Sequence, residues 1–162
     1  MIRVLVICTG NTCRSPMAEV ALRALLSPEL EAQVEVASAG TGAGEGAPAT
    51  PLAIATVAAH GLHLEGHRAR ALTPRLVREA DLILAMEPRH AEWARSLAPD
   101  SRDRIHLVTD QGAEGGVAEA GVRDPLGGTA EEYADTFHLI RSHLLRWVPL
   151  IRAEIERQEG VR

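Results

Sequence analysis

The residues best suited to chemistry lie together near the start of the chain, at positions 8 to 15. They read Cys-Thr-Gly-Asn-Thr-Cys-Arg-Ser, between the apolar run 2–7 and the sequence Pro-Met-Ala-Glu at 16–19. Cys8 would end a strand, and Arg14 follows six positions later where a helix opens. The pattern predicts a loop that holds an oxyanion against the sulfur of Cys8.

Each residue type in this loop suits a separate task. A helix N-terminus favours the thiolate form of a nearby cysteine, so we expect Cys8 to be an ionised nucleophile. The planar guanidinium of Arg14 matches two oxygens of a phosphate group. Gly10 permits a turn that a side chain would obstruct, and the loop N–H groups can bind the remaining oxygens. The predicted phosphate-binding residues are Thr9, Gly10, Asn11, Thr12, Cys13, Arg14 and Ser15.

Other interpretations of these residues stay open. A cysteine that ends a buried strand is often a small core residue, and an arginine near a helix start is often a surface group. The spacing of Cys8 and Arg14 at one strand-to-helix junction favours the catalytic interpretation. Cys13 suits either loop packing or a redox role, in which it forms a disulfide with Cys8 on oxidation.

Phosphoryl transfer also needs an acid that gives the leaving group a proton. Asp124, followed by Pro125, is the candidate, at the end of the glycine-rich stretch 109–128. Alone, Asp-Pro is a turn signal, and only the loop at 8–15 makes Asp124 a candidate acid. A stretch of this length without periodicity is expected to be functional or mobile.

Length and composition exclude several classes of protein. The 162 residues predict a single domain, 1–162, and the net charge of −5 argues against nucleic acid or an anionic membrane as a partner. We expect a cytoplasmic protein, because no segment approaches the roughly 20 apolar residues of a membrane span and no signal peptide is recognisable. Seven scattered histidines, of which only His60 and His63 are close in sequence, predict no metal site, and no cofactor is expected. The oligomeric state stays open.

Strands and helices are expected to alternate along the chain. The expected strands are 2–7, 34–38, 81–86 and 105–108. The expected helices are 15–28 with Ser15 as N-cap, 51–60, a short helix that starts at 73–74, 88–97, and a long C-terminal helix. A capping box at 129–132 is expected to begin the C-terminal helix, and Pro149 is expected to kink or interrupt it. This order predicts an α/β fold with a four-stranded, mostly parallel sheet and helices on both faces. The phosphate loop then lies between the first strand and the first helix, beyond the carboxyl ends of the strands.

The motifs closely resemble, in the same order along nearly the whole chain, those of the low molecular weight protein tyrosine phosphatase family. The matching segments are 8–19, 38–41, 66–70, 81–86 and 124–125. The resemblance implies that Cys8 is the nucleophile, Arg14 the phosphate clamp and Asp124 the general acid and then base. It further implies that the Ser15 hydroxyl donates to the thiolate and that Asn11 holds the loop in a strained shape, supported by Ser38 and His67. By itself, His67 suits a surface position equally well.

Two positions bear on the substrate. Members of the family that act on phosphotyrosine usually carry an aliphatic residue at the position of Thr12 and aromatic residues after Asp-Pro, where this chain has Leu126-Gly-Gly. The chain therefore looks more like the bacterial protein arginine phosphatase branch. A threonine hydroxyl can accept a hydrogen bond from a guanidinium, and a leucine offers no stacking wall to a phenyl ring. We expect phosphoarginine in proteins as the substrate, with phosphotyrosine as the alternative.

Three other activities fit less well. An arsenate reductase of this fold passes a disulfide to a downstream cysteine, and no cysteine follows Cys13. A cysteine phosphocarrier would not need Arg14 or Asp124. A binding domain with a degenerate pocket would be expected to lack one of the catalytic positions, and this chain has them all.

Overall fold

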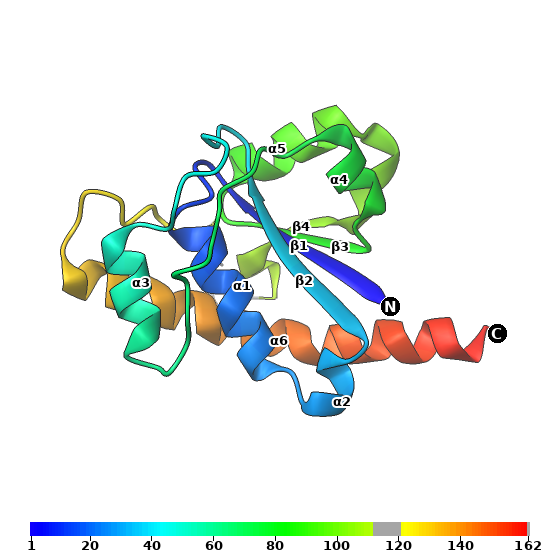
Figure 1. Cartoon of the computed structure of the whole chain (residues 1–162). Helices are drawn as coiled ribbons and strands as arrows, with labels where there is room; N and C mark the ends of the chain where they lie inside the picture. The colour runs from blue at the N-terminus through cyan, green and yellow to red at the C-terminus, as the bar shows by residue number, and fades with distance from the viewer. Residues whose placement is uncertain (112–120, 162) are drawn as a thin grey trace.

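The computed structural model describes residues 1–111 and 121–161, and within them the strands form one sheet in the order β2-β1-β3-β4 (Figure 1). The strands are β1 (Ile2–Cys8), β2 (Val34–Gly40), β3 (Leu82–Ala85) and β4 (Ile105–Leu107). Every pairing between them is parallel, which confirms the predicted α/β fold. Their carboxyl ends therefore meet at one edge. Residues 112–120, part of the predicted loop 109–128, lie outside the described residues.

Helices cover both faces of the sheet (Figure 1). The helices α1 (Arg14–Leu25), α3 (Pro51–Ala58) and α6 (Ala130–Gly160) pack on one face, and α4 (Pro74–Glu79) and α5 (Pro88–Leu97) pack on the other. In β1, Val4 and Val6 belong to the first core cluster, and Leu5 and Ile7 belong to the second. This double burial explains why residues 2–7 are almost continuously apolar.

The helix that follows the loop does not begin as predicted. Cys13, rather than Ser15, is the N-cap of α1, and its side chain makes no capping hydrogen bond. The reason is that the Ser15 hydroxyl is bound to Cys8 and Asn11 instead. The short helix α2 (Pro28–Glu31) was not predicted, and Ser27 caps it by accepting from the Leu30 N–H at 3.4 Å.

The long C-terminal helix continues through Pro149. Of the two outcomes expected there, a kink or an interruption, the interruption is therefore wrong. Pro149 has no N–H, so the Leu145 carbonyl lacks its helical hydrogen-bond donor. Leu145 is exposed, and its carbonyl can accept a hydrogen bond from water instead. The helix begins as predicted, because the Thr129 hydroxyl accepts from the Glu132 N–H at 3.2 Å.

Strand β2 is an edge strand whose outer carbonyl groups are bound by arginines. Arg23 donates to the Val36 carbonyl at 2.6 Å, and Arg70 donates from Nε to the Ser38 carbonyl at 3.0 Å. The strand also runs to Gly40, two residues further than predicted, because the Gly40 N–H donates to the Arg70 carbonyl at 2.9 Å. These bonds reduce the exposure of an unpaired sheet edge.

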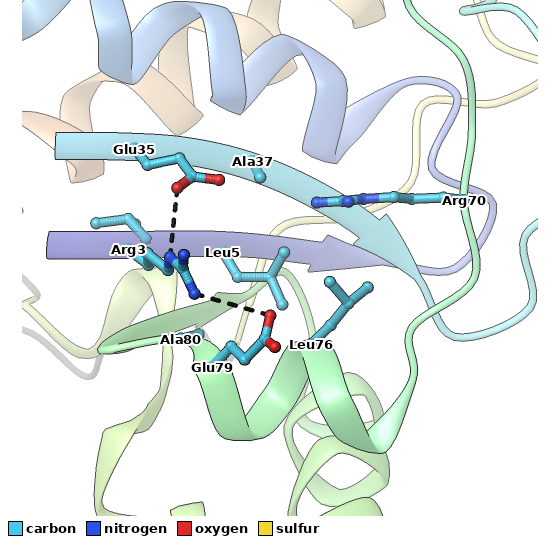
Figure 2. A pocket seen from close by; sticks show the side chains of 9 residues that line it. Arg3, Leu5, Glu35, Ala37, Arg70, Leu76, Glu79 and Ala80 are labelled. Atoms are coloured by element: carbon cyan, nitrogen blue, oxygen red, sulfur yellow. Dashed lines mark ion pairs between the residues drawn. The ribbon is translucent and has the colours of Figure 1, made fainter. Parts of the chain in front are cut away.

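A pocket of about 140 Å³ lies on the face of the sheet that α4 covers, between β1, β2 and α4 (Figure 2). At one end, Arg3 pairs with Glu35 at 3.3 Å and with Glu79 at 3.8 Å. Arg70 lies at the other end, along β2, as Figure 2 shows. The pocket is formed by exposed charged side chains around an apolar floor that includes Leu5.

Candidate active site

The loop between β1 and α1 turns its carbonyl groups toward the segment that follows β2. The Cys8 carbonyl accepts from the Thr41 N–H, and the Thr9 carbonyl accepts from the Gly42 N–H, both at 2.9 Å. Gly40 makes this approach possible, because a Cβ there would collide with the Thr9 carbonyl oxygen. Within the described part of the chain, the N–H groups of residues 9–13 make no hydrogen bond, so they remain open to an anion.

Asn11 holds the shape of this loop. Its φ of 55° lies in the left-handed region, which is strained for a residue other than glycine. Its Nδ2 donates to the hydroxyls of Ser15 at 2.8 Å and Ser38 at 2.9 Å, and its Oδ1 accepts from the Arg70 N–H at 3.0 Å. The Asn11 carbonyl lies 2.6 Å from His67 Nε2. The structure therefore brings Ser38 and His67 to Asn11, as the resemblance implies.

Cys8 ends β1 in a buried position, and its Sγ lies 2.9 Å from Ser15 Oγ. The Ser15 hydroxyl already accepts a hydrogen bond from Asn11 Nδ2. Its single proton is therefore free to be donated to the sulfur of Cys8. This direction stabilises a thiolate, since hydrogen bonds to a charged acceptor favour the charged form.

The guanidinium of Arg14 is almost fully buried, with 1% of the side chain exposed. Its Nη1 donates to Glu87 Oε2 at 2.7 Å and to the Val122 carbonyl at 2.9 Å. Its Nη2 lies 3.3 Å from Asp124 Oδ2, and its Nε is buried without a hydrogen-bond partner. A buried N–H without a partner is costly, so the edge formed by Nε and Nη2 is suited to two oxygens of an anion.

Glu87 is a residue of this site that the sequence analysis missed. Burial opposes its ionisation, but hydrogen bonds from Arg14 and Arg89 outweigh this and lower the pKa of Glu87. Glu87 is therefore a carboxylate that compensates the charge of Arg14. Its position just after the strand 81–86 was the available signal, because ligands lie at the carboxyl ends of strands.

Asp124 lies at the loop between β1 and α1, although it is distant from that loop in the sequence. The preceding segment is held against the end of β3, since the Val122 N–H donates to the Met86 carbonyl at 2.6 Å. Gly121 has a φ of 102°, and a Cβ there would collide with the same carbonyl oxygen. The partly exposed Asp124 carboxylate is thus placed beside Arg14 at the mouth of the loop.

Cys13 contacts Asp124 rather than the open side of the loop. Its Sγ donates to Asp124 Oδ1 at 3.4 Å, and the same oxygen accepts from the Leu126 N–H at 3.1 Å. Burial, followed by the negative charge of Asp124, raises the pKa of Cys13 to about 12. Cys13 is therefore a neutral thiol in the resting protein.

His90 is a second residue of this site that the sequence analysis did not single out. The ring is buried, with Nδ1 3.1 Å from the Glu87 backbone nitrogen and Nε2 2.8 Å from Thr9 Oγ1. Burial, followed by the positive charge of Arg14, lowers the pKa of His90 to about 4. The imidazole is therefore neutral near pH 7.

The side chains of the two predicted specificity residues, Thr12 and Leu126, take no part in the bonds described above. Leu126 is 62% exposed just after Asp124, and Thr12 is partly buried. The Thr12 carbonyl accepts from the Thr50 N–H at 2.9 Å, and the Thr50 hydroxyl lies 3.2 Å from the hydroxyl of Tyr133. Tyr133 is buried, with 2% exposed, so its ring supports this loop and presents no open stacking face.

The described residues form neither a metal-binding cluster nor a membrane-spanning helix. No three His, Cys, Asp or Glu side chains within residues 1–111 and 121–161 are grouped so that they could hold a metal ion. No helix in that same part of the chain is both long enough and apolar enough to cross a membrane.

Comparison with known proteins identifies the family. The model of the family described as low molecular weight phosphotyrosine protein phosphatase matches residues 3–160. The low molecular weight protein-tyrosine-phosphatase Wzb of Escherichia coli (strain K12) is 40% identical over 151 residues, which are 93% of this chain and 96% of that protein. The chain therefore belongs to the low molecular weight protein tyrosine phosphatase family and is a low molecular weight protein phosphatase.

Two solved structures are also similar to this chain. Tyrosine phosphatase Wzb from Escherichia coli K30, in complex with sulphate, has a TM-score of 0.81 at 33% identity, covering 93% of this chain and 99% of that one. The YwlE arginine phosphatase from Geobacillus stearothermophilus has a TM-score of 0.82 at 30% identity, covering 95% of each chain. The structural likeness thus extends to both branches, whereas the sequence relative named above is a tyrosine phosphatase.

Proposed function

We propose that the protein hydrolyses phosphotyrosine in phosphoproteins through a phosphocysteine intermediate on Cys8. The observation that carries the mechanism is the buried guanidinium edge of Arg14, whose Nε has no partner, beside a loop of unbonded N–H groups that starts at Cys8. An anion that fits this loop is held at the nucleophile by charge and by several donors.

In the first step, the Cys8 thiolate attacks phosphorus and the P–O bond to the leaving group breaks. Asp124 enters this step protonated, in exchange for the ion pair that its carboxylate makes with Arg14 in the resting protein, and gives its proton to the departing oxygen, which leaves as a neutral alcohol or phenol. Arg14 and the loop N–H groups bind the phosphoryl oxygens. Because the substrate phosphate would take Arg14 Nη2, it would release the Asp124 oxygen that lies 3.3 Å away in the resting protein.

In the second step, the Asp124 carboxylate takes a proton from a water molecule. The water oxygen attacks phosphorus, and the P–S bond breaks. Inorganic phosphate leaves, the Cys8 thiolate is restored with a hydrogen bond from Ser15, and Asp124 is again protonated for the next cycle. Atoms and charges balance without any further reactant.

The substrate assignment follows the sequence relatives, which favour phosphotyrosine over the phosphoarginine that Thr12 and Leu126 suggest. Phosphoarginine is the second candidate, supported by the exposed Leu126 in place of an aromatic wall and by the likeness to an arginine phosphatase. The chemistry requires a reduced cysteine, which supports the cytoplasm as the site of action.

Trapping the intermediate tests the mechanism. Rapid quenching of an Asp124→Asn variant with labelled substrate should leave phosphate on a peptide that contains Cys8, since the second step lacks its base. Cys8→Ala should neither turn over nor become labelled. Turnover by Cys8→Ala comparable to the parent would overturn the proposed mechanism.

Parallel rates test the substrate. Phosphotyrosine and phosphoarginine peptides of the same flanking sequence should be hydrolysed by the parent with kcat/KM higher for phosphotyrosine. A higher value for phosphoarginine would replace the substrate assignment while leaving the roles of Cys8, Arg14 and Asp124 intact.

A further inference from the structure

We propose that His90 is a positioning residue for the phosphatase reaction. Its imidazole joins the start of α5, where Glu87 holds Arg14, to Thr9, the residue after Cys8. His90 would thereby fix the phosphate clamp relative to the nucleophile without touching the substrate. This inference rests on the roles proposed above for Cys8 and Arg14.

The hydrogen bonds of the ring have a defined direction. His90 Nδ1 lies 3.1 Å from the Glu87 backbone nitrogen, which can only donate, so Nδ1 must be the acceptor. In a neutral imidazole the proton is then on Nε2, which donates to Thr9 Oγ1 at 2.8 Å. Both ring nitrogens are therefore used, one on each side of the site.

The surroundings support the neutral ring. His90 is 1% exposed, and this burial, together with the cations Arg14 and Arg89, outweighs the carboxylates of Glu87, 3.7 Å from Nε2, and of Asp124, which favour a charged ring. A protonated ring would carry hydrogen on both nitrogens, and Nδ1 would then face the Glu87 N–H, donor against donor. The two hydrogen bonds of the ring, which together form a bridge between Glu87 and Thr9, therefore exist only in the neutral tautomer.

The two ends of the bridge are both tied to the chemistry. Glu87 uses its backbone for His90 and its carboxylate for Arg14, at 2.7 Å. Thr9 uses its hydroxyl for His90 and its carbonyl for the Gly42 N–H, at 2.9 Å. Loss of the Thr9–His90 bond would let α5 shift relative to the loop, and a displacement of about 1 Å can cost on the order of a hundredfold in rate.

Two substitutions of His90 separate the two bonds. His90→Asn keeps an acceptor near the position of Nδ1 but is too short to reach Thr9. His90→Gln is long enough to place an amide N–H near the position of Nε2. Thr9→Val removes the hydroxyl while keeping the shape of the side chain. His106→Asn is the matched control, because His106, the middle residue of β4, packs against Trp147 and lines a pocket with Ile2 and Asp81, at the starts of β1 and β3 and away from the loop.

For His90→Asn we expect kcat/KM for p-nitrophenyl phosphate to fall roughly tenfold, the scale of one lost hydrogen bond together with a misplaced clamp. Inhibition by vanadate, which adopts the geometry of the transition state on the cysteine, should weaken by a similar factor. Inhibition by inorganic phosphate should change less than about threefold, because ground-state binding depends less on alignment. His90→Gln should recover most of the loss, and His106→Asn should match the parent.

The double variant Thr9→Val/His90→Asn provides the decisive comparison. If the bridge acts as a unit, the double variant should be no slower than the slower single variant. Activities are expressed per folded molecule, with folding followed by circular dichroism. Losses that multiply in the double variant, equal shifts for vanadate and phosphate, or full activity in folded His90→Asn would each overturn the proposal. Activity in Cys8→Ala would instead overturn the mechanism on which it rests.

Discussion

Arg14 on α1 donates to the carboxylate of Glu87 at 2.7 Å and thereby joins two parts of the chain that are 73 positions apart. The guanidinium is almost fully buried, whereas the carboxylate is partly exposed. A buried charge needs a partner of opposite sign, because removal of one partner leaves the other uncompensated. Glu87 is therefore part of what allows the guanidinium of Arg14, the proposed phosphate clamp, to lie buried inside this fold.

Glu87→Ala should lower the free energy of unfolding by roughly 1.5–3 kcal/mol, the range for a hydrogen bond to a charged group. Urea unfolding at pH 7 measures the change. Glu92→Ala, on an exposed position of the same helix, is the control and should stay within about 0.5 kcal/mol of the parent. Equal stability of the two variants would show that Asp124 and the Val122 carbonyl suffice for Arg14.

Asp124→Asn should slow the hydrolysis of substrates with poor leaving groups much more than that of substrates with good ones. An amide cannot protonate the departing oxygen, and a phenol of high pKa needs that proton most. Single-turnover rates on phenyl phosphate and p-nitrophenyl phosphate measure the difference within one variant. The same loss on both compounds would contradict the role of Asp124 as general acid.

His90 should make the protein less stable in mild acid. Its pKa of about 4 in the folded protein lies below the value of about 6.5 for an unfolded chain, so between these values the unfolded chain binds an extra proton. The contribution of the neutral His90 ring to the free energy of unfolding is complete above pH 6.5. It is lost as the pH falls toward 4, by up to about 3 kcal/mol. Urea unfolding from pH 4.5 to 7.5 should therefore give a steeper profile for the parent than for His90→Gln. Parallel profiles would show that the ring becomes protonated without cost.

Peroxide should inactivate the protein reversibly through a disulfide between Cys8 and Cys13. Peroxide converts the Cys8 thiolate to a sulfenic acid, and the Cys13 thiol then condenses with it and releases water. Asp124, which accepts from Cys13 at 3.4 Å, is placed to take the thiol proton. Peptide mapping after peroxide should find the bridge in the parent and sulfinic acid on Cys8 in Cys13→Ser. Only over-oxidised Cys8 in the parent, with Cys13 free, would contradict the prediction.

Thr12→Ile should shift the substrate preference toward phosphotyrosine. The hydroxyl of Thr12 is suited to accept from a guanidinium, and a hydrogen bond to a charged group is worth about 1.5–3 kcal/mol. The ratio of kcat/KM for phosphotyrosine to that for phosphoarginine should therefore rise by roughly one to two powers of ten. Both peptides are measured on both proteins, and an equal change for each would limit Thr12 to a structural role in the loop.

The sequence determined the part of the site that is local in the chain. Cys8, Arg14 and the loop between them are consecutive, and one strand and one helix suffice to place them. The parallel sheet also followed from the sequence, because β1 is apolar on both faces and strands alternate with helices. The beginning of α1 was misjudged for a local reason, since Ser15 turns inward to Cys8 and does not cap the helix.

Only the tertiary structure decided that Glu87 and His90 complete the site, whereas the resemblance implied the other distant residues, Asp124, Ser38 and His67. Glu87 and His90 look in the sequence like an ordinary acid before a helix and one of several scattered histidines. Their roles appear only when the carboxyl ends of β1 and β3 lie side by side and bring α5 to the loop. Hydrogen bonds and ion pairs between residues about 70 to 80 positions apart depend on this packing, which no local pattern of residue types specifies.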